Sequence, residues 1–303
     1  HIKYIKMEYR KIGNSDLELS AITFGAWAAG GWMWGSTDRN DAIRAIKAGY
    51  DLSVYNRSTD KTEEFKGVAT VYQSISELVN NCDIIFTMLT NDEAVNQVYQ
   101  EVLKEELSGK LFIDFSTISQ ECSLTNAELV KAKGAGFIDA PVAGSTIPAK
   151  EGTLIMMTGG NERDIERAQP YLDKLGKLTK HLGANGSGVA AKLSINYFLS
   201  LIYQGLAETV LFSEQLGLER KDMLEIINES ACGNGATKVK TPLLINDSYP
   251  AAFALDLMLK DILLAQKAGA DFPLSQAMID TYQNAQNKGL GKNDVIGIIE
   301  ALR

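Results

Sequence analysis

Short apolar runs alternate with helical patterns between residues 51 and 160. The runs are rich in β-branched and aromatic side chains, and the segments between them repeat apolar positions at helical spacing. The expected strands are 51–55, 83–88, 111–115, 136–138 and 154–158, and the expected helices between them are 74–80, 92–103, 119–133 and 162–175. This alternation predicts a mostly parallel sheet covered by helices on both faces.

The alternation stops near residue 183, and only long helical periodicities follow it. They cover residues 188–216, 221–229, 253–268, 274–288 and 293–302. The pattern therefore predicts an α/β domain over residues 1–183, built as a doubly wound, mostly parallel sheet, and then an all-α domain over residues 184–303. In a doubly wound sheet the ligand lies outside the carboxyl ends of the strands. The first long helix begins directly after the last strand–helix unit, so we expect its first turns to face that ligand.

Composition excludes several classes of protein. The chain has 303 residues, with 30 Lys plus Arg against 38 Asp plus Glu, and no basic cluster, so nucleic acid is not an expected partner. No apolar run approaches the roughly 20 residues that span a bilayer, and the first residues lack the apolar core of a signal peptide. We therefore expect a cytoplasmic protein without a membrane partner. Three separate cysteines and two histidines, one of them His1, favour neither a zinc site nor a Ser–His–Asp triad, so no metal is expected.

Residues 186–196 are the strongest candidates for chemistry. Two glycines open a helix that places Lys192 and Asn196 four positions apart, and therefore on one face. The neighbouring positions are apolar, and desolvation there would lower the pKa of Lys192 towards a range useful for proton transfer. The alternative is a lysine that lies along a half-buried helix with its ammonium in water and has no catalytic role.

The spacing Gly-x-Gly-x-x-x-Lys-x-x-x-Asn over residues 186–196 resembles the catalytic signature of the β-hydroxyacid dehydrogenase family. This family includes 3-hydroxyisobutyrate dehydrogenase and the glyoxylate and succinic semialdehyde reductases. Further family marks occur in the expected order: Met-Leu-Thr at 88–90, Asp-Phe-Ser-Thr-Ile at 114–118, Asp-Ala-Pro-Val-Ala-Gly-Ser at 139–145, and Lys-Asp at 260–261. The resemblance runs from about residue 46 to residue 303. It implies a Rossmann-like first domain.

The resemblance also implies roles for particular residues. Lys192 would be the general acid and base, and Asn196 would hold the lysine or the substrate by hydrogen bonds. The nicotinamide end of the cofactor would be lined by Leu89, Thr90, Ala94 and Thr117, with Lys260 reaching the cofactor from the helical domain. The backbone N–H groups of Ala143, Gly144 and Ser145 would bind a substrate carboxylate, although family members often have serine where this chain has Ala143.

The residues after the expected strand 51–55 indicate which cofactor is preferred. An acidic residue at this place would bind an unphosphorylated ribose, whereas the chain has Asn56, Arg57 and Ser58. An arginine and a hydroxyl suit a 2′-phosphate, so NADP(H) is favoured over NAD(H). A surface turn with a solvated arginine is the alternative.

The first 45 residues differ from the rest of the chain in composition and in family resemblance. Trp27, Trp32 and Trp34 are all the tryptophans of the chain, and no Gly-x-Gly-x-x-Gly is present there to receive a pyrophosphate. Residues 7–45 resemble the opening hairpin, first strand and first loop of an aldo-keto reductase, so a chimera is expected. We expect a hairpin, a strand over 22–26 entering the sheet beside 51–55, and a helix over 38–48.

Together these observations predict an NADP(H)-dependent oxidoreductase. It would interconvert a short-chain β-hydroxyacid or hydroxyacid and the corresponding semialdehyde or keto acid by hydride transfer. The expected partners are this small carboxylate-bearing substrate and further copies of the chain in a dimer or tetramer. Two alternatives stay open: a folded chimera with weak or no cofactor binding and no activity, and an aldo-keto reductase, which would need barrel strands that do not follow residue 45.

Overall fold

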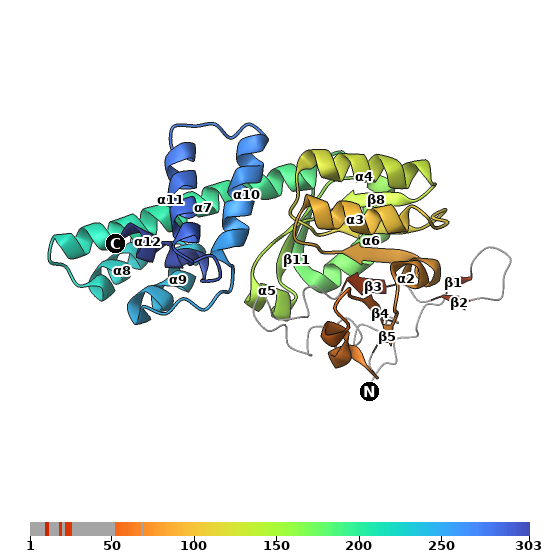
Figure 1. Ribbon diagram of the computed structural model, residues 1–303, viewed down its shortest axis with the longest axis horizontal. Coiled ribbons are helices and arrows are strands. Elements are labelled where there is room, and N and C mark those ends of the chain that lie inside the picture. The colour runs from red at the N-terminus through yellow and green to blue at the C-terminus, as the bar shows by residue number, and fades with distance from the viewer. Residues whose placement is uncertain (1–9, 12–17, 20–21, 26–51, 68) are drawn as a thin grey trace. The chain divides into compact units, whose positions relative to one another are not determined.

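The protein divides into two units within one long helix. The computed structural model describes residues 10–11, 18–19, 22–25, 52–67 and 69–303. Among these, the first unit reaches Lys192 and the second begins at Leu193, both in α7 (Ser187–Gln215). The sequence placed the boundary earlier, between residues 183 and 184. The described strands all belong to the first unit (Figure 1).

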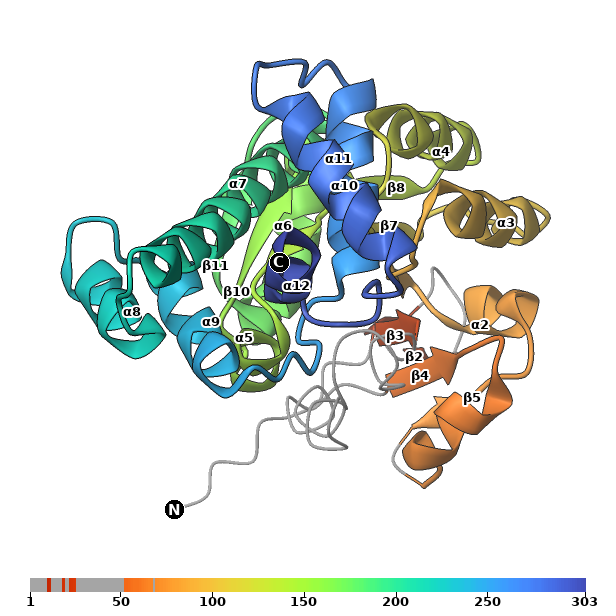
Figure 2. The same ribbon diagram turned by 60° about the vertical axis from the view of Figure 1, so that its left-hand side comes forward.

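A parallel sheet of six strands forms the centre of the first unit. Its order is β5-β4-β3-β6-β7-β8, and every neighbouring pair is parallel. The bounds are β3 Ile22–Gly25, β4 Leu52–Tyr55, β5 Thr70–Val71, β6 Ile84–Thr87, β7 Leu111–Asp114 and β8 Gly136–Asp139. The expected strand at 22–26 does enter the sheet beside 51–55, with Ile22 opposite Leu52 (Figure 2). The strand order reverses direction beside β3, which makes a topological switch point between β3 and β6.

Helices cover both faces of this sheet. The side chain of Phe112 in β7 packs against Tyr99 of α3 (Asp92–Val102), with ring centroids 5.9 Å apart. Its neighbour Ile113 belongs instead to the core cluster that includes Leu172 of α6 (Glu162–Leu175). Alternate residues of one strand thus bury against helices on opposite faces, as period-two geometry requires. The first unit also contains α2 Ile75–Asn81, α4 Gln120–Ala132 and a 3-10 helix at Thr59–Phe65.

Capping residues explain where these helices begin. The side chains of four N-cap residues each accept a hydrogen bond from the N–H group three residues further along. They are Ser74, Asn91, Ser119 and Asn161. Such a cap typically contributes about 1 kcal/mol. The sequence located all four helices because caps and apolar periodicity are local signals.

A second sheet of three strands extends the first unit. Its order is β11-β10-β9, with β10 parallel to β11 and antiparallel to β9. The bounds are β9 Val142–Ala143, β10 Leu154–Thr158 and β11 Gly176–His181, with α5 at Thr146–Glu151. Only β10 was expected. The other two strands were missed because β9 is very short and β11 carries a mostly polar sequence.

Part of the front segment is described. Arg10–Lys11 (β1) pairs antiparallel with Glu18–Leu19 (β2), as expected of the hairpin. The three tryptophans and the helix expected over 38–48 lie outside the described residues.

The second unit is helical around one apolar core. After α7 come α8 Arg220–Glu229, α9 Gly235–Asn246, α10 Leu255–Lys267, α11 Ser275–Asn287, a 3-10 helix Val295–Ile298 and α12 Ile299–Leu302. The pattern at 293–302 predicted one helix, but Asp294 caps a 3-10 turn first by accepting the N–H of Ile296. Helix α9 was missed because its apolar residues do not gather on one face. None of the helices in the described ranges is long and apolar enough to cross a membrane.

Candidate active site

The residues expected around the cofactor gather at one edge of the parallel sheet. Leu89 and Thr90 follow β6, Thr117 follows the neighbouring β7, and Ala94 lies in the first turn of α3. All four are half-buried. Because β6 and β7 are parallel neighbours, their carboxyl ends bring these residues to the edge where a doubly wound sheet binds its ligand.

A buried carboxylate holds this edge together. The Oδ1 atom of Asp114 accepts hydrogen bonds from Thr87 Oγ1 at 2.8 Å and from Ser116 Oγ at 2.6 Å. Ser116 Oγ in turn accepts the N–H of Leu89 at 2.9 Å. Burial raises the pKa of Asp114 to about 6, although its hydrogen bonds act in the opposite direction. The sequence placed Asp114 in a family motif but gave it no role.

The turn after β4 presents an arginine. Asn56 is buried, and its Oδ1 accepts the N–H of Ser58 at 2.9 Å. Arg57 between them is exposed, and Ser58 is half-buried. This short turn therefore fixes Asn56 and Ser58 on either side of an exposed guanidinium, at the carboxyl end of the strand beside β3.

Asp139 fixes the beginning of α7. It lies at the carboxyl end of β8 and is fully buried. Its Oδ1 accepts the N–H of Gly186 at 2.8 Å and its Oδ2 accepts the N–H of Val189 at 3.0 Å. Burial raises the pKa of Asp139, and these backbone hydrogen bonds oppose the shift. A carboxylate at this place satisfies N–H groups that have no partner inside the helix.

The structure explains why the signature has glycine at positions 186 and 188. Gly186 has φ +86°, which a residue with a Cβ rarely adopts. At Gly188 an added Cβ would overlap the carbonyl oxygen of Met157. The glycines thus let α7 begin directly against β8 and β10, and Asp139 completes this arrangement. Asp139 was part of the quoted motif, but no role was assigned to it from sequence.

The expected catalytic residues are buried on α7. Lys192 is 6% exposed and Asn196 is 2% exposed. A lysine that extends its ammonium into water would be far more exposed, so the alternative of a solvated lysine is not supported. The continuous helix keeps both side chains on one face, as the sequence predicted.

Asp261 joins two of the expected residues within the second unit. Asn196 Nδ2 donates to Asp261 Oδ2 at 2.6 Å. Lys260 Nζ lies 2.9 Å from Asp261 Oδ1, and Asp261 is 3% exposed. The sequence singled out Lys260 and Asn196 separately, and no sequence signal linked them through the carboxylate of Asp261.

Three residues, 140–142, separate β8 from the loop that is expected to bind a carboxylate. Ala143 ends β9, Gly144 has φ +125°, and Ser145 is the N-cap of α5 with no side-chain capping bond. A Cβ on Gly144 would lie 2.9 Å from side-chain atoms of Leu154 and Pro148, so the loop requires glycine there. Carboxylate binding by these three residues stays a prediction.

Comparison with known proteins identifies the family. Residues 39–183 match the model described as the NAD binding domain of 6-phosphogluconate dehydrogenase. Residues 186–302 match the model described as NAD-binding of NADP-dependent 3-hydroxyisobutyrate dehydrogenase. Glyoxylate/succinic semialdehyde reductase 2 of Arabidopsis thaliana is 34% identical over 270 residues, which are 86% of this chain and 75% of that protein. The chain belongs to the β-hydroxyacid dehydrogenase family.

Other members of the β-hydroxyacid dehydrogenase family agree with this assignment. The mitochondrial 3-hydroxyisobutyrate dehydrogenase of Drosophila melanogaster is 33% identical over 283 residues, 89% of this chain and 87% of that protein. The structure of Mycobacterium tuberculosis 3-hydroxyisobutyrate dehydrogenase with L-serine superimposes with a TM-score of 0.82 at 28% identity and covers 94% of this chain and 99% of that chain. The fold prediction of a Rossmann-like domain followed by a helical domain is confirmed. The protein is an oxidoreductase of this family.

Proposed function

We propose that this β-hydroxyacid dehydrogenase uses NADP(H) to interconvert a short-chain β-hydroxyacid or hydroxyacid and the corresponding semialdehyde or keto acid. The observation that carries the proposal is the buried pair Lys192 and Asn196, with Asn196 held by Asp261. Burial of polar side chains costs free energy unless they are hydrogen-bonded, and a buried lysine beside a hydrogen-bonded amide is typical of functional sites. Relatives named glyoxylate/succinic semialdehyde reductase and 3-hydroxyisobutyrate dehydrogenase support a small carboxylate substrate.

The described residues suit a dinucleotide at the carboxyl edge of the sheet. The switch point beside β3, the half-buried residues after β6 and β7, and the exposed Arg57 after β4 are the parts that such a cofactor needs. The nicotinamide would supply or accept the hydride when bound. Leu89, Thr90, Ala94 and Thr117 would then line its ring, and Lys260 would reach the cofactor from α10.

Lys192 moves the proton in this proposal. During reduction its ammonium gives a proton to the oxygen of the substrate carbonyl as the alkoxide develops, and during oxidation the neutral amine takes the proton back. Because Asn196 Nδ2 donates to Asp261, its amide oxygen remains an acceptor, which suits a neighbouring ammonium one helical turn away. The N–H groups of Ala143, Gly144 and Ser145 would hold the substrate carboxylate.

Lys192→Ala tests the assignment of the proton donor. We expect turnover to fall by about 10²–10⁴-fold, the usual contribution of a general acid, while NADPH binding changes by only a small factor. Steady-state rates with glyoxylate and succinic semialdehyde, together with NADPH titration by nicotinamide fluorescence, give the two values. Equal loss of turnover and NADPH binding, or only a two-fold loss of turnover, would contradict the assignment.

The exposed Arg57 supports a preference for NADP(H). A guanidinium can form charged hydrogen bonds to a 2′-phosphate, and NADH offers no equivalent group. We expect the protein to bind NADPH more tightly than NADH and Arg57→Ala to remove this difference by weakening NADPH binding alone. Titration of both proteins with both nucleotides measures it, and NADH serves as the internal control. Tighter binding of NADH by the unmodified protein would refute the preference.

We also propose that the front of the chain is a replacement of the first strand–helix unit. The match to the family model begins at residue 39, and residues 7–45 resemble the start of an aldo-keto reductase. The described strand β3 supplies the sheet position that the replaced unit would fill.

A homo-oligomer stays a prediction from the sequence. Exposed apolar side chains of the helical unit support it, because soluble monomers rarely expose several large apolar side chains on neighbouring helices. They include Phe198, Phe212, Leu216 and Ile226, each at least 60% exposed.

A further inference from the structure

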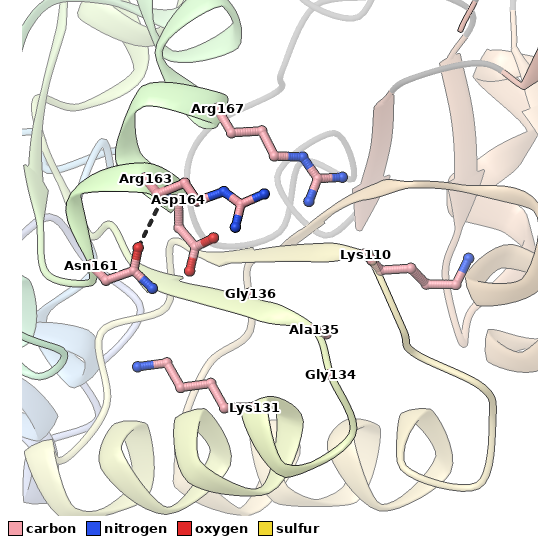
Figure 3. Close-up of a pocket in the computed structure, with 10 residues that line it drawn as sticks. Lys110, Lys131, Gly134, Ala135, Gly136, Asn161, Arg163, Asp164 and Arg167 are labelled. Carbon is pink, nitrogen blue, oxygen red and sulfur yellow. Dashed lines mark hydrogen bonds between the residues drawn. The ribbon is translucent and has the colours of Figure 1, made fainter. Parts of the chain in front are cut away.

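A pocket of about 540 Å³ opens at the amino ends of β7 and β8 (Figure 3). This edge is opposite to the one that carries Leu89, Thr117 and Asp139, because those residues lie at or after the carboxyl ends of their strands. The pocket is therefore separate from the cofactor edge. Its lining comes from the turn before β7, the end of α4, the turn into β8 and the start of α6: Gly109, Lys110, Lys131, Gly134, Ala135, Gly136, Asn161, Arg163, Asp164 and Arg167.

The lining is strongly positive. Lys110, Lys131, Arg163 and Arg167 oppose a single carboxylate, Asp164, on a chain whose net charge is −8. Arg163 and Arg167 are one helical turn apart and project beside each other (Figure 3). Such a concentration of one sign in a hollow attracts ions of the opposite sign. The sequence did not reveal it, because the four cations come from three separate elements.

In the described part of the chain, none of these four cations forms an ion pair with a carboxylate. Within the part of the chain that the structure describes, neither arginine forms an ion pair or a side-chain hydrogen bond. Lys110 Nζ donates to the carbonyl oxygen of Cys82 at 2.9 Å, and Lys131 Nζ donates to Asn185 Oδ1. Both acceptors are neutral, so the positive charges remain. Burial lowers the pKa of Lys110, and the nearby Asp83 opposes this shift.

The backbone of the pocket is firmly built. The N–H of Gly109 donates to the carbonyl oxygen of Gly134 at 3.1 Å, which joins the turns before β7 and β8. Both glycines have positive φ values, +78° each. A Cβ at Gly136 would lie 2.6 Å from Asp164 Oδ1, so glycine there leaves room for that carboxylate. The backbone that carries the cations is thus held in place by hydrogen bonds and close packing.

We propose that this pocket binds a small phosphate-bearing polyanion at a site distinct from the cofactor edge. A tetrahedral phosphate accepts hydrogen bonds from several directions, which fits a pocket lined by cations of α4, α6 and the turn before β7. A planar carboxylate is best served by one guanidinium. The volume lies within the usual range for pockets that bind small molecules and exceeds the needs of inorganic phosphate alone.

Binding of pyrophosphate to the full chain tests the proposal. The titration is followed by calorimetry at constant ionic strength, with citrate as a carboxylate anion of comparable charge. We expect pyrophosphate to bind at least about ten-fold more tightly than citrate, and the double variant Arg163→Gln/Arg167→Gln to weaken pyrophosphate binding by at least about ten-fold. Asp164→Asn should strengthen it, because this change removes the one negative charge among the described residues of the lining.

Two further variants show whether pyrophosphate binds in this pocket or elsewhere on the protein. Lys174→Gln removes an exposed cation of the same helix that does not line the pocket, and Arg57→Ala removes the arginine at the cofactor edge. Lys174→Gln should bind pyrophosphate as the unmodified protein does, and Arg57→Ala should retain the binding that the double arginine variant loses. The proposal is overturned if pyrophosphate does not bind, if the double arginine variant binds it unchanged, or if Arg57→Ala abolishes binding. A misfolded double variant is recognised by its melting curve, and Asp164→Asn then decides, because damage to the fold would not strengthen binding.

Discussion

Single buried carboxylates position the parts of the candidate active site. Asp114 holds the turn after β6 through Ser116, Asp139 holds the first turn of α7, and Asp261 holds Asn196 and pairs with Lys260. Each accepts hydrogen bonds from groups that would otherwise be buried without a partner, which would cost about 1–3 kcal/mol per group. These carboxylates therefore position residues that we propose act on the cofactor and the substrate.

Asp114 makes the stability depend on pH. Its pKa is raised by burial to about 6 from an ordinary value of 3.8. Between these values the folded state binds more protons than the unfolded state, so the free energy of unfolding falls as the pH rises from about 4 to about 6. Asp114→Asn keeps an oxygen for Thr87 and Ser116 and removes the charge, so it should reduce this fall by ~1.4 kcal/mol for each pH unit between the two pKa values. Urea unfolding at several pH values measures it, and an identical slope in both proteins would contradict the prediction.

At the scale of elements, alanine substitutions at two glycines of α7 are expected to change the stability of the protein in opposite directions. Gly188 lies against the carbonyl oxygen of Met157, whereas nothing lies within 4 Å of a Cβ built at Gly205. We expect Gly188→Ala to destabilise the protein by about 1–3 kcal/mol through overpacking. The matched control Gly205→Ala should stabilise it by about 0.5–1 kcal/mol, because alanine is the better helix former. Thermal unfolding of the two variants decides, and equal shifts would mean that α7 does not begin as closely against β10 as described.

The elements differ in how well local sequence predicts them. Helices with an N-cap residue and an apolar stripe, such as α3 and α6, begin within a residue of the expected position. Helix α9 was missed although Asn234 and Thr237 form a capping box, because its apolar residues do not gather on one face. Strand β11 was missed because its pairing with β10, rather than its own polar sequence, makes it a strand.

At the scale of the whole molecule, the front segment supplies an interior strand to a sheet made by the rest of the chain. β3 pairs with β4 on one side and β6 on the other, so the switch point depends on it. If residues 7–45 replace the family's own unit, a short Gly-Leu-Gly-x-Met-Gly turn in place of residues 25–35 should tighten NADPH binding, because bare backbone lets a pyrophosphate approach a helix N-terminus. Fluorescence titration compares it with a turn of equal length that lacks glycine. Unchanged affinity would contradict the stated effect of the replacement.

The sequence alone determined the order of most elements, the division into an α/β and an all-α part, the family signature and the placement of Lys192 and Asn196 on one helix. These are carried by periodicity, caps and short motifs, which depend on interactions between residues near in the chain. The tertiary structure decided that Asp139 anchors Gly186, 47 residues away, that Asn196 bonds to Asp261, 65 residues away, which also pairs with Lys260, and that four cations share one pocket. Such contacts follow from strand order, register and helix packing, and these are settled by burial of the whole core rather than by any local pattern.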